Sequence, residues 1–307
     1  MGSEQEIRNL MVSCYKMGNA GYAQGNLEKA YECFRMSREW GVKLCRQSED
    51  LFDRGEFLPQ ICEGLSRICE QLNRQEEAAF YCREGIEQRR SVLEIMSRED
   101  RIQMQKRAMV RDYRYLASYY EDMADEENVI ACCREAIPLS VELFNAGETE
   151  EDGRNLLVFA DRLGSSDYLS GNLDEALWCF QDAMNVRYSL QDEKGDMAAR
   201  EMFAQNYEYL GHIYYRKGNF QLAMECYAEK LEIHIGLFHE SPTPERFGRC
   251  AWSYYHLSTV LDDAGEREYL EKALGIVTRI IEQYPKLTEE YRALGMRCLE
   301  KLQRFRN

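Results

Sequence analysis

The clearest pattern in the chain is a set of apolar positions spaced three and four residues apart. Between Gly171 and Ala183 the sequence reads GNLDEALWCFQDA, and a related segment, GNFQLAMECYAEK, runs from Gly218 to Lys230. In the first segment the apolar or small residues fall at positions 173, 176, 180 and 183. Such residues lie on one face of an α-helix. A second apolar stripe precedes each segment, so the pattern predicts a helix, a Gly-Asn turn and another helix.

This helix-turn-helix unit recurs along the whole chain. A small residue marks the first helix of each unit, and the members of this small-residue column are Gly18, Ser66, Ala117, Gly164, Gly211, Ser258 and Gly295. From Ala117 to Ser258 the members stand 47 residues apart. Two helices can approach closely only where no large side chain intervenes. The column therefore predicts a close helix-helix contact in every unit.

The repeats predict six helical hairpins and a last, unpaired helix. The hairpins are expected near residues 5–50, 57–97, 100–145, 150–191, 195–240 and 243–284, and the last helix near 287–305. In the sixth hairpin the first helix is expected near 243–264 and the second near 266–284. Polar segments such as FNAGETEEDG, or segments that carry glycine and proline, separate them. We expect one continuous array over residues 1–307, whose last helix covers the exposed core of the sixth hairpin.

The order of an aromatic residue, Leu-Gly, Tyr, Gly-Asn, Ala and Tyr resembles the tetratricopeptide repeat. The fifth unit carries most of it, at Tyr207, Leu210, Gly211, Tyr214, Gly218, Ala223 and Tyr227. The usual repeat of that family has ~34 residues, so the spacing of 47 indicates a long-period variant. The resemblance implies an all-α fold: a right-handed superhelical α-solenoid of six helix-turn-helix repeats plus a C-terminal capping helix.

Composition narrows the class of partner. The 307 residues are 45% hydrophobic and 30% charged, which is typical of a folded soluble protein. A net charge of −15 opposes binding to nucleic acid, and no run approaches the ~18 apolar residues of a membrane span. The chain has twelve cysteines, and its first residues lack the pattern of a secretory signal, which favours a reducing, cytoplasmic location.

The candidate chemical groups do not form a recognisable reactive set. Four cysteines, at positions 33, 132, 179 and 226, share one repeat position. They could form a thiol ladder, but stacked helices stand ~8–10 Å apart, so we interpret them as small packing residues. The four histidines lack HxxxH or HExxH spacing, and no GxSxG, phosphate-loop or dinucleotide pattern occurs. We therefore expect no catalytic residue, no metal and no cofactor, and a protein that is not an enzyme.

The resemblance further implies that the first helices line a concave groove for a partner. A basic island from Arg98 to Arg114 could clamp carboxylates or phosphates, or could instead pair with the acidic loops. Rings in the last repeats could anchor apolar groups, although many of them must be core. The predicted groove residues are Arg67, Arg111, Arg114, Tyr115, Arg162, Tyr168, Tyr209, His212, Tyr215, Trp252, Tyr255 and His256.

These features favour a non-enzymatic scaffold or adaptor that holds a protein or peptide segment, with acidic groups at the basic end of the groove. Two alternatives stay open. One is a signal-peptide receptor or response regulator resembling bacterial quorum-sensing proteins, and the other is the sensor part of a larger multidomain protein. The Lys/Asn/Asn/Lys/Arg clamp of some family members is matched only at Asn19 and Arg111, so a chaperone-tail clamp is not expected.

Overall fold

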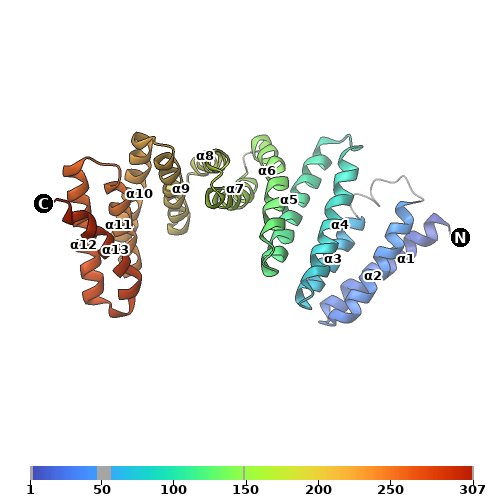
Figure 1. The fold of residues 1–307 in the computed structure, drawn as a ribbon. Helices are drawn as coiled ribbons and strands as arrows, with labels where there is room; N and C mark the ends of the chain where they lie inside the picture. Colours follow the sequence, from blue (N-terminus) through green and yellow to red (C-terminus); the bar gives the residue numbers. More distant parts are fainter. Residues whose placement is uncertain (1–2, 47–56, 148, 306–307) are drawn as a thin grey trace. The chain divides into compact units, whose positions relative to one another are not determined.

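The computed structural model describes residues 3–46, 57–147 and 149–305 (Figure 1). In these ranges the chain forms thirteen α-helices and no strand, which confirms the all-α class. The first helices of the hairpins are α1 (Glu4–Ala23), α3 (Leu58–Gln71), α5 (Glu99–Asp122), α7 (Glu150–Ser170), α9 (Met197–Arg216) and α11 (Pro244–Ser258). The second helices are α2 (Leu27–Cys45), α4 (Gln75–Leu93), α6 (Glu126–Gly147), α8 (Leu173–Ser189), α10 (Phe220–Glu240) and α12 (Asp263–Gln283), and α13 (Thr288–Gln303) is the last helix.

Every expected helix is present, and the main departure lies in the sixth hairpin. The sequence pattern predicts a first helix to residue 264, but α11 ends at Ser258. The side chain of Asp262 accepts a hydrogen bond from the Gly265 backbone N–H at 3.0 Å. This N-cap starts α12 at Asp263, before the expected position 266. The expected end of the first hairpin, at residue 50, lies outside the described residues.

The helices divide into two compact units, Met1–Arg162 and Leu163–Asn307. In the first unit each hairpin packs together and contacts the next, through α2 with α3 and α4 with α5. In the second unit α9 packs on α10, α10 on α11, α11 on α12, and α12 on α13. Tyr291, Leu294 and Cys298 of α13 are buried in the core of the sixth hairpin, which gives that hairpin its cover. One continuous array over residues 1–307 stays a prediction.

Five hairpin turns share one backbone arrangement. Each places a residue in the left-handed region, with φ between 55° and 85°: Gly25, Asn73, Ala124, Gly171 and Gly218. The following residue donates its N–H to the carbonyl five residues earlier, at 2.8 to 3.0 Å. This bond closes the preceding helix and turns the chain into the next. The predicted Gly-Asn turn is thus one form of an arrangement that Asn73 and Ala124 also adopt.

The small-residue column lies against the rings of the second helices. A Cβ atom on Gly211 would come within 2.5 Å of Tyr227 Cε1, and one on Gly18 within 2.7 Å of Phe34 Cδ2. At Gly164 the nearest side chains, Cys179 and Phe180, would lie at 3.1 Å. A larger residue at Gly18 or Gly211 would therefore force the two helices apart. At these positions the structure confirms the prediction that a small residue allows the two helices to approach closely.

The four cysteines of one repeat position are packing residues of the core. Cys33, Cys132, Cys179 and Cys226 are all buried. Burial raises the pKa of the Cys132 and Cys226 thiols to about 12. These two side chains therefore stay protonated at neutral pH, in keeping with a packing role.

Candidate functional site

A cavity of about 1000 Å³ opens beside the first helices α3, α5 and α7 in the first unit. Four arginines and three acidic residues line it, together with Tyr115, Ser118 and Asn155. The arginines are Arg89, Arg107, Arg111 and Arg114, and the acidic residues are Glu63, Glu151 and Asp152. Three of the twelve predicted groove residues, Arg111, Arg114 and Tyr115, lie here.

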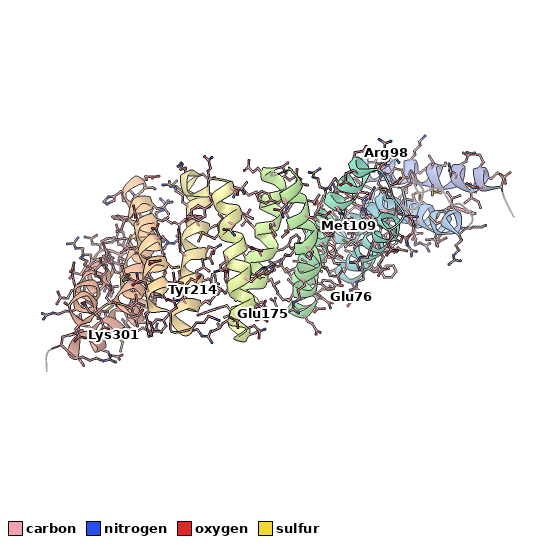
Figure 2. The ribbon with its side chains drawn as sticks, turned by 90° about the horizontal axis from the view of Figure 1, so that it is seen from above. Glu76, Arg98, Met109, Glu175, Tyr214 and Lys301 are labelled. Atoms are coloured by element: carbon pink, nitrogen blue, oxygen red, sulfur yellow. The ribbon has the colours of Figure 1, made fainter. Side chains whose placement is uncertain are left out.

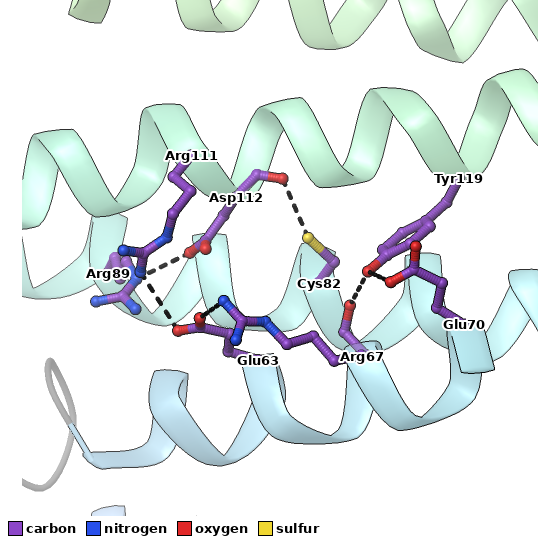
Figure 3. Close-up of polar contacts among 9 residues, drawn as sticks. Glu63, Arg67, Glu70, Cys82, Arg89, Arg111, Asp112 and Tyr119 are labelled. Carbon is purple, nitrogen blue, oxygen red and sulfur yellow. Dashed lines mark hydrogen bonds and ion pairs between the residues drawn. The ribbon is translucent and has the colours of Figure 1, made fainter. Parts of the chain in front are cut away.

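Two predicted arginines share one carboxylate at this cavity (Figure 3). Arg67 Nη2 lies 2.6 Å from Glu63 Oε1, and Arg111 Nη2 lies 3.3 Å from Glu63 Oε2. The guanidinium carbon of Arg67 lies 5.6 Å from the centre of the Tyr115 ring. Both arginine side chains remain close to half exposed. One negative charge therefore faces two positive ones, and both guanidiniums stay open to solvent.

Other arginines of the basic island form ion pairs with acidic side chains. Arg107 binds the buried carboxylate of Asp152 at 2.9 Å. Arg89, which precedes the island on α4, is buried and binds Asp112 at 3.0 Å. Arg98, labelled in Figure 2, pairs with Asp100 at the start of α5 and is not among the residues that line the cavity. The ion-pair interpretation therefore applies to Arg98 and Arg107, whereas a clamp for acidic groups at Arg111 and Arg114 stays a prediction.

Arg114 and Arg162 differ in their surroundings. The Nη1 group of Arg114 donates to the neutral amide oxygen of Asn155 at 2.7 Å, so this partner leaves its charge uncompensated. Arg162 forms an ion pair with Glu121 and does not line the cavity. The expectation that Arg162 joins the other arginines around one ligand therefore stays without geometric support.

In the second unit the predicted rings mostly pack against each other. Tyr209 stacks on the core residue Phe180, with ring centres 4.5 Å apart and planes 9° apart. Tyr168 meets Tyr209 edge to face at 5.5 Å and lies beside His212 at 6.3 Å. Tyr215 is exposed and contacts Phe220 at the turn, at 5.5 Å. Tyr209 is therefore partly a core residue, and Tyr215 contacts the hairpin turn.

The rings of α11 are partly covered by the last helix. The guanidinium carbon of Arg297 lies 5.8 Å from the Trp252 ring centre, and Lys301 Nζ lies 5.4 Å from that of Tyr255. Both cations come from α13. Trp252 also lines a second cavity of about 560 Å³. Of the two rings, Trp252 has the clearer access to a ligand.

This second cavity contains a buried lysine. Lys230 Nζ lies 2.7 Å from Glu208 Oε2 and 3.1 Å from His256 Nδ1, and the residue is only 1% exposed. Burial lowers the pKa of the Lys230 ammonium, which the nearby Glu208 carboxylate opposes. Burial also lowers the pKa of His212, and it lowers that of His256 further with the help of the Lys230 charge. Both histidines are therefore neutral at pH 7.

A second polar group borders the same cavity. Glu201 pairs with Arg249, and its Oε2 lies 3.7 Å from His234 Nε2. His234 Nδ1 lies 2.7 Å from Ser253 Oγ, which itself donates to the Arg249 carbonyl at 2.9 Å. Because that hydroxyl proton is committed, His234 Nδ1 is the donor to Ser253. Burial lowers the pKa of His234 to about 3.

Lys230 is the functional candidate that the sequence analysis missed, although the repeat carries a signal for it. Each second helix carries a core-facing residue three positions after one fixed repeat position, which is occupied in turn by Phe34, Cys82, Cys133, Phe180, Tyr227 and Leu274. In the other five hairpins it is small or apolar: Ser37, Gly85, Ala136, Ala183 and Val277. In the fifth hairpin this position is Lys230, a charged residue on a buried stripe. Such an exception predicts a buried charge with nearby partners.

Residues 204–233 match the model of the tetratricopeptide repeat family. They run from α9 through the Gly218 turn into α10. Residues 204–233 form a tetratricopeptide repeat. This repeat contains Glu208, His212 and Lys230, so the polar cluster of the second cavity is built largely on it.

One solved structure resembles nearly the whole chain in fold. The nuclear import adaptor Nro1 of S. pombe is similar over 97% of this chain and 97% of its own, with 14% identity and a TM-score of 0.54. BtubC of P. vanneervenii is similar over 87% of this chain and 91% of its own, with 16% identity and a TM-score of 0.46. No curated protein sequence matches the chain. Among the described helices, none combines the length and apolar character that crossing a bilayer requires.

Proposed function

We propose that the chain is a non-enzymatic scaffold or adaptor that binds a segment of a partner protein on its first helices. In the first unit the segment's acidic groups bind Arg67, Arg111 and Arg114. In the second unit apolar groups contact Trp252 beside the smaller cavity. The tetratricopeptide repeat at residues 204–233 supports this class of function, because repeat arrays present extended surfaces to other chains.

The sharing of Glu63 by Arg67 and Arg111 carries the proposal. A guanidinium forms its strongest contact as a bidentate pair with a carboxylate or phosphate. Here one carboxylate serves two guanidiniums, and Arg114, three residues beyond Arg111 on the same helix face, has an amide as partner. An acidic group entering the cavity supplies the missing negative charge. It also finds room, because the cavity volume is about 1000 Å³.

The proposal includes a cytoplasmic location. All twelve cysteines are free thiols, which favours a compartment in which cysteines stay reduced. Other charged residues form ion pairs between hairpins. Arg38 on α2 and Glu84 on α4, for example, pair at 2.5 Å.

The test uses a fluorescein-labelled decapeptide of glutamate and serine, and a second peptide with glutamine in place of glutamate. Fluorescence polarisation measures their affinity for the wild type and for the double variant Arg111→Ala/Arg114→Ala. We expect the double variant to bind the glutamate peptide at least about tenfold more weakly, a difference of ~1.4 kcal/mol. Added salt should weaken the wild-type complex.

The matched control is Arg98→Ala/Arg101→Ala, which removes two charges from the same helix but outside the cavity lining. It should stay within about twofold of the wild type. Arg101 stands ten residues before Arg111, roughly 15 Å along α5, and exposed charges that far apart are largely screened at 0.1 M salt. Equal affinity of the cavity variant and the wild type would discard this placement of the acidic groups. Equal binding of the glutamine peptide would discard the acidic character of the partner.

A further inference from the structure

Three metal-ligating side chains meet on the first helices of the second unit. Glu208 and His212 stand four residues apart on α9 and so lie on one face, and His256 comes from α11. One donor atom from each lies within 4.8 Å of the donor atoms of the other two. The rings of His212 and His256 have centres 4.7 Å apart and planes at 78°. The spacing of Glu208 and His212 was visible in the sequence, but the third member comes from the next hairpin.

The donor set suits a borderline transition-metal cation. Two imidazoles and one carboxylate are ligands of Zn²⁺, with bonds of about 2.0 to 2.2 Å. Donor atoms around one tetrahedral ion then lie roughly 3.3 Å apart, so the three side chains need to close by about 1.5 Å at most. Glu208 and His256 line the 560 Å³ cavity, so both side chains border open space.

The site already holds a positive charge. The Lys230 ammonium contacts two of the three candidate ligands, Glu208 and His256, at 2.7 and 3.1 Å. A cation is therefore favoured at this point of the molecule. A divalent ion would interact more strongly with Glu208 and would also engage His212, but it must first displace the ammonium.

We propose that Glu208, His212 and His256 bind a divalent transition-metal cation, with Zn²⁺ as the best match, and that Lys230 competes with the metal for the site. Glu208 and His256 both line the 560 Å³ cavity, so a bound ion would have its remaining coordination position directed to that space. Three protein ligands with one open position are the arrangement in which a metal takes up a ligand from solution.

The experiment measures Zn²⁺ binding to the full chain by isothermal titration calorimetry and Co²⁺ binding by visible absorption. We expect one ion per chain in the wild type, and at least a tenfold loss of affinity in His212→Ala and in His256→Ala. Lys230→Met should raise the affinity at least tenfold, because it removes the competing ammonium and leaves Glu208 without its partner. Circular dichroism checks that each variant retains its helices.

His239→Ala is the matched control, because His239 is exposed in the same unit and lies outside the cluster. It should leave the affinity unchanged. The proposal fails if the wild type and Lys230→Met both bind no stoichiometric ion. It also fails if His212→Ala and His256→Ala bind as tightly as the wild type, or if Co²⁺ gives the intense near-ultraviolet bands of thiolate ligation. The direct loss in the histidine variants decides the question even if Lys230→Met does not fold.

Discussion

The ring of Tyr227 lies directly on the backbone of Gly211, so closely that a Cβ atom there would meet Tyr227 Cε1 at 2.5 Å. Tyr227 is buried in a core cluster with Leu231 and Leu257. Gly211→Ala should therefore overpack the contact between α9 and α10 and lower the free energy of unfolding by about 1 to 3 kcal/mol. Urea denaturation followed by tryptophan fluorescence measures this. A Trp40→Phe background confines the signal to Trp178 and Trp252 in the second unit.

The control for this prediction is Gly236→Ala in α10. A Cβ atom at Gly236 meets nothing within 4 Å, and alanine favours a helix over glycine by about 1 kcal/mol. This variant should be as stable as the wild type or more so. If both glycine variants change stability by the same amount, helix propensity rather than the Tyr227 contact accounts for the effect.

Ala124 offers a substitution that should stabilise the protein. It occupies the left-handed position of the third hairpin turn with φ of 55°, where the other turns mostly have glycine. An L-residue there costs about 1 to 2 kcal/mol, and glycine avoids that strain. We expect Ala124→Gly to raise the free energy of unfolding by about 1 kcal/mol, measured by urea denaturation. Ala131→Gly, the same change on the exposed face of α6, should lower it by about 1 kcal/mol; destabilisation by both would contradict the turn argument.

The pair of Lys230 and Glu208 should couple strongly. Removing one partner leaves a buried charge uncompensated, which costs about 3 to 5 kcal/mol when both groups are buried. Since Glu208 is one-third exposed, we expect Glu208→Gln to cost about 2 kcal/mol. The double variant Lys230→Met/Glu208→Gln should recover part of this loss, because neither charge remains. A double-mutant cycle in urea gives the coupling energy, and strictly additive effects would show that the two groups do not interact.

Burial of His234 predicts that the second unit loses stability in acid. An unfolded histidine has a pKa of about 6.5, whereas the folded His234 has a pKa of about 3. Below pH 6.5 the unfolded chain therefore takes up a proton that the folded chain does not bind. The free energy of unfolding is highest above this pH and falls by about 1.4 kcal/mol per pH unit down to about pH 3.

His234→Asn tests this dependence. Asparagine keeps a donor for Ser253 but does not titrate. In the Trp40→Phe background, the slope of unfolding free energy against pH between 6.0 and 5.0 should decrease by about 1 kcal/mol per pH unit. The same slope in both proteins would mean that the folded state binds a proton at His234 in this range.

The hairpins could be predicted because the same packing contacts and turns recur along the chain. The small-residue column, the rings opposite it and the Gly-Asn turns recur in phase, so Gly211 and Tyr227 have counterparts in other units. The end of α11 departed from the pattern because one capping residue, Asp262, decides where the next helix starts. The start of α12 thus depends on a single hydrogen bond and not on the repeated spacing of apolar residues.

The candidate site was predictable only in part. Arg67, Arg111 and Arg114 occupy helix faces that the pattern assigns to the groove, and they lie near one another. Which carboxylate each arginine contacts depends on side chains of other hairpins: Glu63 on α3 binds Arg111 on α5, and Glu121 on α5 binds Arg162 on α7. The cluster of Lys230 and His256 likewise joins residues 26 positions apart. Spacing within one helix cannot specify these pairings.

The buried cysteines can report local unfolding of the protein. Cys33, Cys132, Cys179 and Cys226 lie in four different second helices, and all four are buried. A thiol reagent can reach such a sulfur only when local unfolding uncovers it. Labelling followed by peptide mass spectrometry would therefore time the opening of α2, α6, α8 and α10 separately, with no engineered probe. The order of those four rates would reveal from which hairpin the protein begins to unravel.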